Sequence, residues 1–164
     1  MALRLVIAEK PSVAQTIAAA LGIKGKQDGY IEGGGYLISW CVGHLVQLAE
    51  AAAYGEQYKK WSFDSLPILP QEWQYTVAAD KGKQFKILKD LMQRSDVSEV
   101  VNACDAGREG ELIFRFVYHQ AGCKKPFTRL WISSMETDAI RSGFEHLKDG
   151  RGYDTLYHLS LIHI

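Results

Sequence analysis

The chain has 164 residues, of which 47% are hydrophobic and 23% charged, as in an ordinary globular domain. Its 19 Lys and Arg balance 19 Asp and Glu, so no global field attracts nucleic acid, and DNA binding would need a local patch. The sequence also lacks a signal peptide and any apolar run near the roughly 18 residues that a membrane helix needs.

The N-terminal third predicts a strand, a helix and a hairpin. Residues 3–8 form a short apolar run, which is typical of a buried strand. Pro11 then opens a helix that runs to Leu21. Residues 30–38 predict a hairpin that turns at Gly33–Gly35. This triple glycine precedes a strand (36–42) rather than a helix, so it does not have the context of a nucleotide-binding loop.

The middle of the chain gives weaker signals. His44 follows the hairpin, and a lone His is more often a packed or surface residue than a catalytic one. Residues 51–74 carry aromatic residues without periodicity and predict an extended connection with aromatic anchors. A strand at 74–79 and an amphipathic helix at 81–94 follow. The basic face of that helix either lies along phosphates or, as is more usual, faces water.

The C-terminal half predicts further alternation. A β-branched apolar run at 97–104 indicates a buried strand, and an amphipathic helix opens at Glu109. A strand at 128–132 and a helix at 136–147 follow, the latter with serine cap candidates before it. Strands and helices in alternation predict an α/β fold with a mostly parallel, Rossmann-like sheet and helices on both faces.

Three carboxylates are expected to meet at the carboxyl edge of that sheet. Glu9 ends the first strand, Asp105 ends the strand at 97–104, and Glu109 follows in the next turn. The alternative for Glu109 and Glu111 is that they are ordinary acids in the first turn of a helix. Asp105 argues against that alternative, because it precedes the helix and has a distant partner in Glu9.

Carboxylates without His or Cys form a hard oxygen site, which suits Mg²⁺ better than Zn²⁺. Mg²⁺ binds through a few carboxylates together with substrate phosphate, so the site predicts phosphoryl transfer on a nucleotide or nucleic acid. Lys10 and Arg108 are the candidates for contacting that phosphate. The three cysteines form no CxxC motif and indicate small core residues in a reducing cytoplasm.

Four motifs in order give a sharper interpretation: IAEKPSVA (7–14), GHL (43–45), DAGREGELIFR (105–115) and RLWISSM (129–135). Together they resemble the Toprim domain of type IA DNA topoisomerases, nearest to the bacterial topoisomerase III branch. The resemblance implies a Toprim fold over residues 1–150. Residues 151–164 then begin the following topoisomerase segment, and the apolar end LSLIHI is expected to be a truncation.

The resemblance also assigns roles. Glu9 matches a glutamate that binds Mg²⁺ and is associated with proton transfer at the scissile ester, and Lys10 matches a lysine near the scissile phosphate. Asp105 and Glu109 match the first and last acids of the DxDxE element, with Arg108 in its DNA-facing loop. The second acid of that element is Gly107 here, which favours one Mg²⁺ over two.

Type IA enzymes cut single-stranded DNA with a tyrosine nucleophile from a later domain, and none of the eight tyrosines here has that context. The resemblance therefore implies an ATP-independent topoisomerase whose missing C-terminal domains complete it, acting in the bacterial cytoplasm at the nucleoid. The fragment alone is expected not to relax DNA. Two alternatives stay open: a free-standing Toprim nuclease or primase-like enzyme, and a non-catalytic DNA-binding module.

Overall fold

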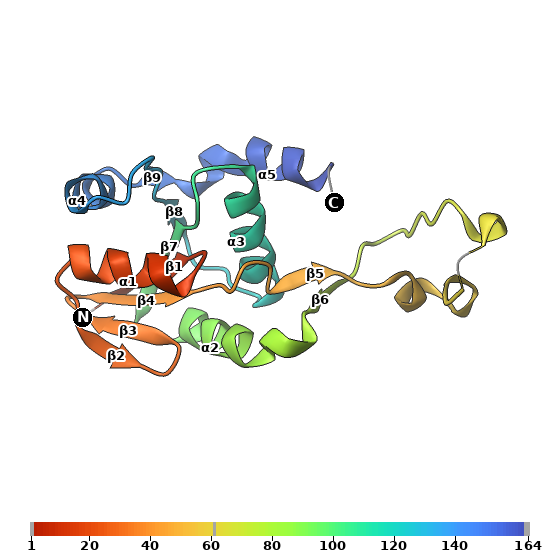
Figure 1. Cartoon of the computed structure of the whole chain (residues 1–164), viewed down its shortest axis with the longest axis horizontal. Coiled ribbons are helices and arrows are strands. Elements are labelled where there is room, and N and C mark those ends of the chain that lie inside the picture. Colours follow the sequence, from red (N-terminus) through yellow and green to blue (C-terminus); the bar gives the residue numbers. More distant parts are fainter. Residues whose placement is uncertain (1, 61, 163–164) are drawn as a thin grey trace.

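The computed structural model describes residues 2–60 and 62–162 and is built on a seven-stranded sheet (Figure 1). The strand order is β2-β3-β4-β1-β7-β8-β9. The strands are β1 (Leu3–Ala8), β2 (Gly25–Gln27), β3 (Tyr30–Gly33), β4 (Tyr36–Trp40), β7 (Val97–Ala103), β8 (Phe127–Arg129) and β9 (Lys148–Asp149). The four central strands, β4, β1, β7 and β8, are parallel, and antiparallel strands extend both edges. The predicted α/β class is therefore confirmed.

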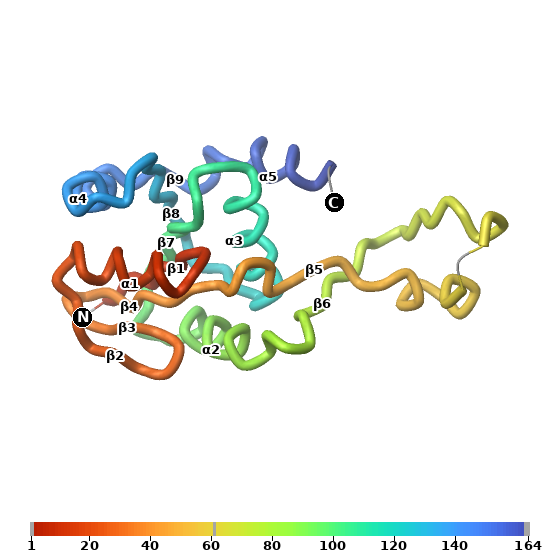
Figure 2. The backbone as a smooth tube through the Cα atoms, viewed as in Figure 1, coloured from red at the N-terminus to blue at the C-terminus, as the bar shows by residue number. Residues whose placement is uncertain are grey.

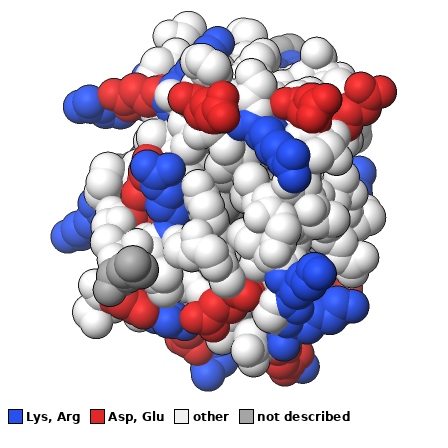
Figure 3. Space-filling model, turned by 90° about the vertical axis from the view of Figure 1, so that its left-hand side faces the viewer, with Lys and Arg blue, Asp and Glu red and all other residues white. Residues whose placement is uncertain are grey.

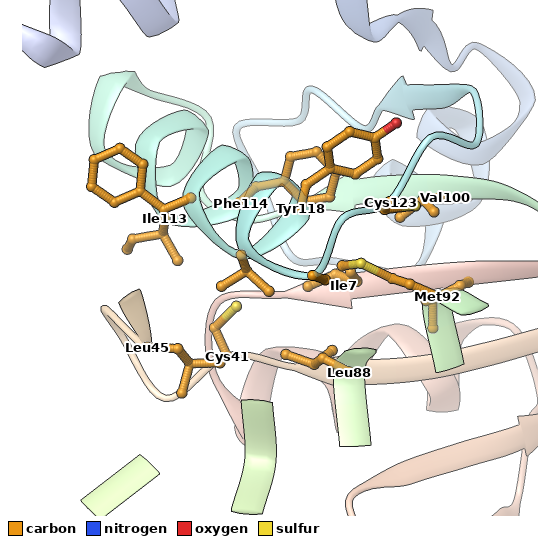
Figure 4. Close-up of a cluster of buried hydrophobic side chains, with 14 of the residues drawn as sticks. Ile7, Cys41, Leu45, Leu88, Met92, Val100, Ile113, Phe114, Tyr118 and Cys123 are labelled. Atoms are coloured by element: carbon orange, nitrogen blue, oxygen red, sulfur yellow. The ribbon is translucent and has the colours of Figure 1, made fainter. Parts of the chain in front are cut away.

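Helices cover both faces of the sheet, because side chains along a strand alternate between its faces. Leu5 and Ile7 of β1 belong to the cluster that includes residues of α2 (Gly82–Gln93) and α3 (Arg108–Gln120). Figure 4 shows part of this cluster, with Ile7 and Val100 from the sheet facing side chains of α3. Val6 and Ala8 belong instead to a cluster with α1 (Pro11–Ala20) and α4 (Thr137–Glu145).

Residues between β4 and α2 form an arm that projects from the rest of the molecule (Figure 2). Its base is a two-stranded antiparallel sheet of β5 (Val46–Leu48) and β6 (Tyr75–Val77). Between β5 and β6, the described residues of the arm include short 3₁₀ turns at Ala51–Tyr54, Glu56–Tyr58 and Phe63–Ser65.

The arm is only partly anchored by aromatic residues. Tyr54 and Trp73 pack edge to face with ring centroids 6.1 Å apart. Phe63 is 94% exposed, so the prediction of aromatic anchoring is wrong for this residue. Trp61, another expected anchor, lies outside the described residues.

Several predicted elements are shorter in the structure than in the sequence pattern, including the strand expected at 74–79, which spans Tyr75–Val77. The strand expected at 128–132 ends at Arg129, where its pairing with Asn102 of β7 also ends. The helix expected at 136–147 spans only Thr137–Glu145, and Glu136 at its start makes no side-chain cap. Ser134 instead accepts a hydrogen bond from the Glu136 amide.

The edge strands and the C-terminal helix were not predicted. A strand of two or three residues, such as β9 or β2, is too short to display a period of two. A single 3₁₀ turn (Gly150–Tyr153) leads into α5 (Asp154–Leu161), which packs against α3. Of the LSLIHI end, the last two residues lie outside the described residues. None of the described helices has the length and apolarity needed to cross a membrane.

Candidate metal and nucleic-acid site

Two acids leave the sheet side by side at its carboxyl edge. Strands β1 and β7 are adjacent and parallel, and their last paired residues are Ala8 and Ala103. Glu9 directly follows β1, and Asp105 lies two residues beyond β7. The structure therefore brings these two residues to neighbouring strand ends, as the sequence pattern predicts.

Glu9 is a nearly buried carboxylate, with 8% of its surface exposed. Its Oε1 lies 3.4 Å from the ammonium group of Lys10, whose side chain is mostly exposed. Lys10 is also the residue that precedes the first turn of α1, where Pro11 supplies the fixed backbone angle. A buried carboxylate needs a partner of opposite charge, and at this position Lys10 or a bound cation can provide it.

We call residues 104–107, which connect β7 to α3, the acid loop. The Asp105 side chain in this loop is exposed, whereas the preceding Cys104 is buried. Gly110 lies directly against the loop: a Cβ atom at Gly110 would come within 2.2 Å of the Asp105 carbonyl oxygen. Only glycine, which has no side chain, permits the first turn of α3 to pack this closely against the acid loop.

Glu109 lies near a residue from another loop. Its Oε1 is 3.3 Å from Nε2 of His44, which follows β4. The backbone carbonyl of His44 in turn accepts a hydrogen bond of 2.9 Å from the Lys81 ammonium group. The sequence predicts no such pairing, because a lone His is more often a packed or surface residue than a catalytic one. Only the fold brings the GHL motif next to Glu109.

A buried polar network lies beneath the acid loop. Glu111 is fully buried and accepts hydrogen bonds from Asn102 Nδ2 (3.0 Å) and Arg115 Nε (2.8 Å). Arg129 is also fully buried, and its Nε lies 3.1 Å from Glu111 Oε2 without alignment for a hydrogen bond. Burial lowers the pKa of the Arg129 guanidinium, and the Glu111 charge opposes that shift. Glu109 and Glu111 both lie in the first turn of α3, but Glu111 is a buried core residue rather than an ordinary exposed acid.

One signal of this network was present in the sequence. Asn102 interrupts the apolar run of β7, and a polar residue in a buried strand requires a hydrogen-bonding partner. The sequence does not reveal which residues those partners are, since Arg129 is 27 positions away.

The candidate metal ligands at the carboxyl edge of the sheet are carboxylate oxygen atoms rather than sulfur atoms. Cys41 and Cys104 are buried beside the site, and the pKa of the Cys104 thiol is raised by its hydrogen bond with Cys41 and by burial. Protonated thiols are poor metal ligands. Across residues 2–60 and 62–162, no group of three or more His, Cys, Asp and Glu residues lies at metal-binding spacing, so the expected convergence of Glu9, Asp105 and Glu109 is not found. Mg²⁺ nevertheless commonly takes only one or two carboxylates, with water and phosphate as its other ligands, so the pair Glu9 and Asp105 fits it.

The two candidate phosphate contacts are exposed. Arg108 is the first residue of α3, and its backbone carbonyl accepts a hydrogen bond of 3.0 Å from Ser160 in α5. Its side chain and that of Lys10 are free to reach solvent. Elsewhere the charges are mixed: on the face shown in Figure 3, Lys and Arg side chains lie among Asp and Glu side chains. A local site, rather than a general field, is what this chain offers to an anionic partner.

Comparisons with known proteins identify a family and its relatives. A family model described as the Toprim domain matches residues 4–135. DNA topoisomerase 3 of Shouchella clausii is 51% identical over 154 residues, which cover 94% of this chain and 21% of that protein. DNA topoisomerase 3 of Bacillus anthracis is 48% identical over 157 residues, covering 96% and 22%. The chain thus spans about a fifth of the length of these relatives.

A solved structure shares the fold. Full-length topoisomerase I from Thermotoga maritima superposes with a TM-score of 0.56 at 22% sequence identity. The match covers 88% of this chain and 21% of that chain.

Proposed function

The chain belongs to the Toprim domain family, and from that premise we propose that it is the Mg²⁺-binding part of a type IA DNA topoisomerase of the topoisomerase III branch. Such an enzyme transiently cleaves and reseals single-stranded DNA through a phosphotyrosine. The observation that carries the proposal is the pair of acids, Glu9 and Asp105, at the ends of adjacent parallel strands. The relatives named DNA topoisomerase 3 support the same assignment.

In this proposal, Glu9 and Asp105 hold one Mg²⁺, whereas Glu109, expected from the sequence as a third ligand, pairs with His44 instead. The ion, when bound, would neutralise charge that develops on the scissile phosphate. Lys10 and Arg108 contact the phosphates of the single strand. Glu9 also handles the proton of the scissile ester, a role supported by its burial next to the Lys10 ammonium group.

Gly107 provides a test of the one-metal arrangement. Its backbone is extended (φ 178°), and a Cβ atom added there meets no other atom within 4 Å, so Gly107→Asp should fold normally. A carboxylate between Asp105 and Glu109 should lower the half-saturating Mg²⁺ concentration about tenfold, the size expected of one added charge near a divalent ion. Thermal unfolding at a series of Mg²⁺ concentrations measures this shift. Gly107→Asn is the matched neutral control, and equal behaviour of the two variants would contradict the metal site.

The covalent step is expected to need residues beyond this chain. We propose residues 1–150 as the Toprim domain and 151–164 as the start of the next segment, with the nucleophilic tyrosine in a later domain. A radiolabelled single-stranded oligonucleotide incubated with the chain and Mg²⁺ should therefore yield no adduct that survives denaturing electrophoresis. A labelled band at the protein's mass would refute the proposed division of labour.

Reading the parent gene past codon 164 tests the same division independently. A continuation that encodes a tyrosine-bearing cleavage domain supports the topoisomerase, which would act in the bacterial cytoplasm on nucleoid DNA. A stop codon at this position would favour the free-standing Toprim enzyme instead.

A further inference from the structure

We propose that Arg129 is the positioning residue of the acid loop, and that its guanidinium sets where Asp105 stands relative to Glu9. This inference rests on the proposed function, because it concerns the same Mg²⁺ site. Arg129 itself touches neither substrate nor metal in the proposal. It acts through the backbone that carries Asp105.

The contacts of Arg129 are directed at one strand end. Its Nη1 donates to the carbonyl oxygens of Asn102 (3.1 Å) and Cys104 (2.6 Å), and its Nη2 donates to the Asp105 carbonyl (2.6 Å). The Asn102 carbonyl lies within β7 and also accepts from the Leu130 amide (2.9 Å), whereas the Cys104 and Asp105 carbonyls lie beyond the end of β7. For these two carbonyls, a planar group with fixed donors replaces the ladder partners that the chain loses as it leaves the sheet.

The guanidinium itself has further partners. Its Nη1 also donates to the Leu130 carbonyl (3.0 Å), and buried Glu111 beside its Nε balances its charge. Glu111 is bound in turn by Arg115, whose Nη2 reaches Asp154 of α5 at 2.7 Å. Arg129 thus joins the acid loop to a network anchored in α3 and α5.

The position of Asp105 is confined by a second contact. The Asp105 backbone rests on Gly110, so it can neither approach α3 more closely nor move away without breaking its bond to Arg129. The Asp105 side chain is exposed, so the backbone that carries it has the larger part in placing its carboxylate. The precision of the acid pair therefore depends on the backbone, and the backbone depends on Arg129.

The test is Arg129→Lys, which keeps the charge and removes the planar fork. Loss of an outer partner of a metal ligand typically costs 10- to 100-fold in metal affinity, so the half-saturating Mg²⁺ concentration in thermal unfolding should rise at least about tenfold. The control is Arg151→Lys, since Arg151 is an exposed arginine whose side chain pairs with Asp149 rather than with the acid loop. Its Mg²⁺ dependence should match the wild type.

The outcomes separate this inference from the proposed function. A wild type that Mg²⁺ does not stabilise would refute the proposed metal site itself. The second outcome is that Mg²⁺ stabilises the wild type, while Arg129→Lys has a lower Tm but the same half-saturating Mg²⁺ concentration. Arg129 would then be a purely structural residue, and the inference would be overturned.

A measurement on the wild type covers the case in which Arg129→Lys does not fold. With ¹⁵N-arginine labelling, the Arg129 side-chain resonances should shift with the same Mg²⁺ midpoint as the Tm, while those of Arg151 stay fixed. Arg129 resonances that remain unchanged through saturation would overturn the inference.

Discussion

Asp105→Asn should lose most of the rise in Tm that Mg²⁺ gives the wild-type chain. A ligand that binds only the folded state at a hundredfold excess over its Kd adds about 2.7 kcal/mol of stability. For a chain of this size that corresponds to about 5–10 °C in Tm. Asparagine keeps the shape of Asp105 but not its charge, and Mg²⁺ binding at Glu9 alone should be far weaker.

The matched control for this prediction is Asp64→Asn. Asp64 is an exposed acid in the arm, far along the chain from the acid loop, so its variant should keep the full Mg²⁺ response. Scanning calorimetry with and without about 10 mM Mg²⁺, at constant ionic strength, measures the rise in Tm of each variant. If Asp105→Asn and the wild type shift equally, Mg²⁺ binds elsewhere and the site is wrong.

Gly110→Ala should destabilise the chain strongly, although alanine is the better helix former. Helix propensity alone favours Ala over Gly by about 1 kcal/mol. Against this, the new Cβ atom would lie 2.2 Å from the Asp105 carbonyl oxygen and 2.9 Å from its nitrogen, both backbone atoms with little freedom to move. Overpacking of this kind costs about 3 kcal/mol, so the steric effect wins and Tm should fall by about 4–8 °C.

The same substitution at Gly107, earlier in the chain, provides the control. Gly107→Ala meets open space on an extended backbone and should leave Tm within about 2 °C of the wild type. Gly110→Ala should also raise the half-saturating Mg²⁺ concentration, because the added Cβ atom would displace the backbone of Asp105, a proposed metal ligand. A Tm for Gly110→Ala equal to or above that of the wild type would show that α3 can shift away from the acid loop at little cost.

The parts of the site predicted from sequence are those that strand ends determine. β1 and β7 are long, apolar and buried, so their boundaries and the acids that follow them could be inferred from pattern alone. Glu9 and Asp105 reach the same edge because the two strands are parallel neighbours. Pattern also predicted the hairpin at Gly33–Gly35, where positive φ angles require glycine.

The parts that were missed depend on contacts between distant residues. Arg129 reads as a strand residue, yet its side chain lies in the core and binds carbonyls that are more than 20 positions away. His44 meets Glu109 across 65 positions. The arm was expected to have aromatic anchors, but Phe63 is exposed. Without a periodic pattern of apolar neighbours, the sequence does not show whether an aromatic residue is buried.

Both margins of the central sheet end in very short strands, β2 with three residues and β9 with two. A longer exposed edge strand would offer unpaired amides and carbonyls to another molecule, and such edges are templates for intermolecular strand pairing and aggregation. Here Lys26 and Lys148 add charge to these margins, which further opposes such pairing. The parallel centre, slow to assemble in any chain, is thereby kept from serving as a seed for aggregates once it has formed.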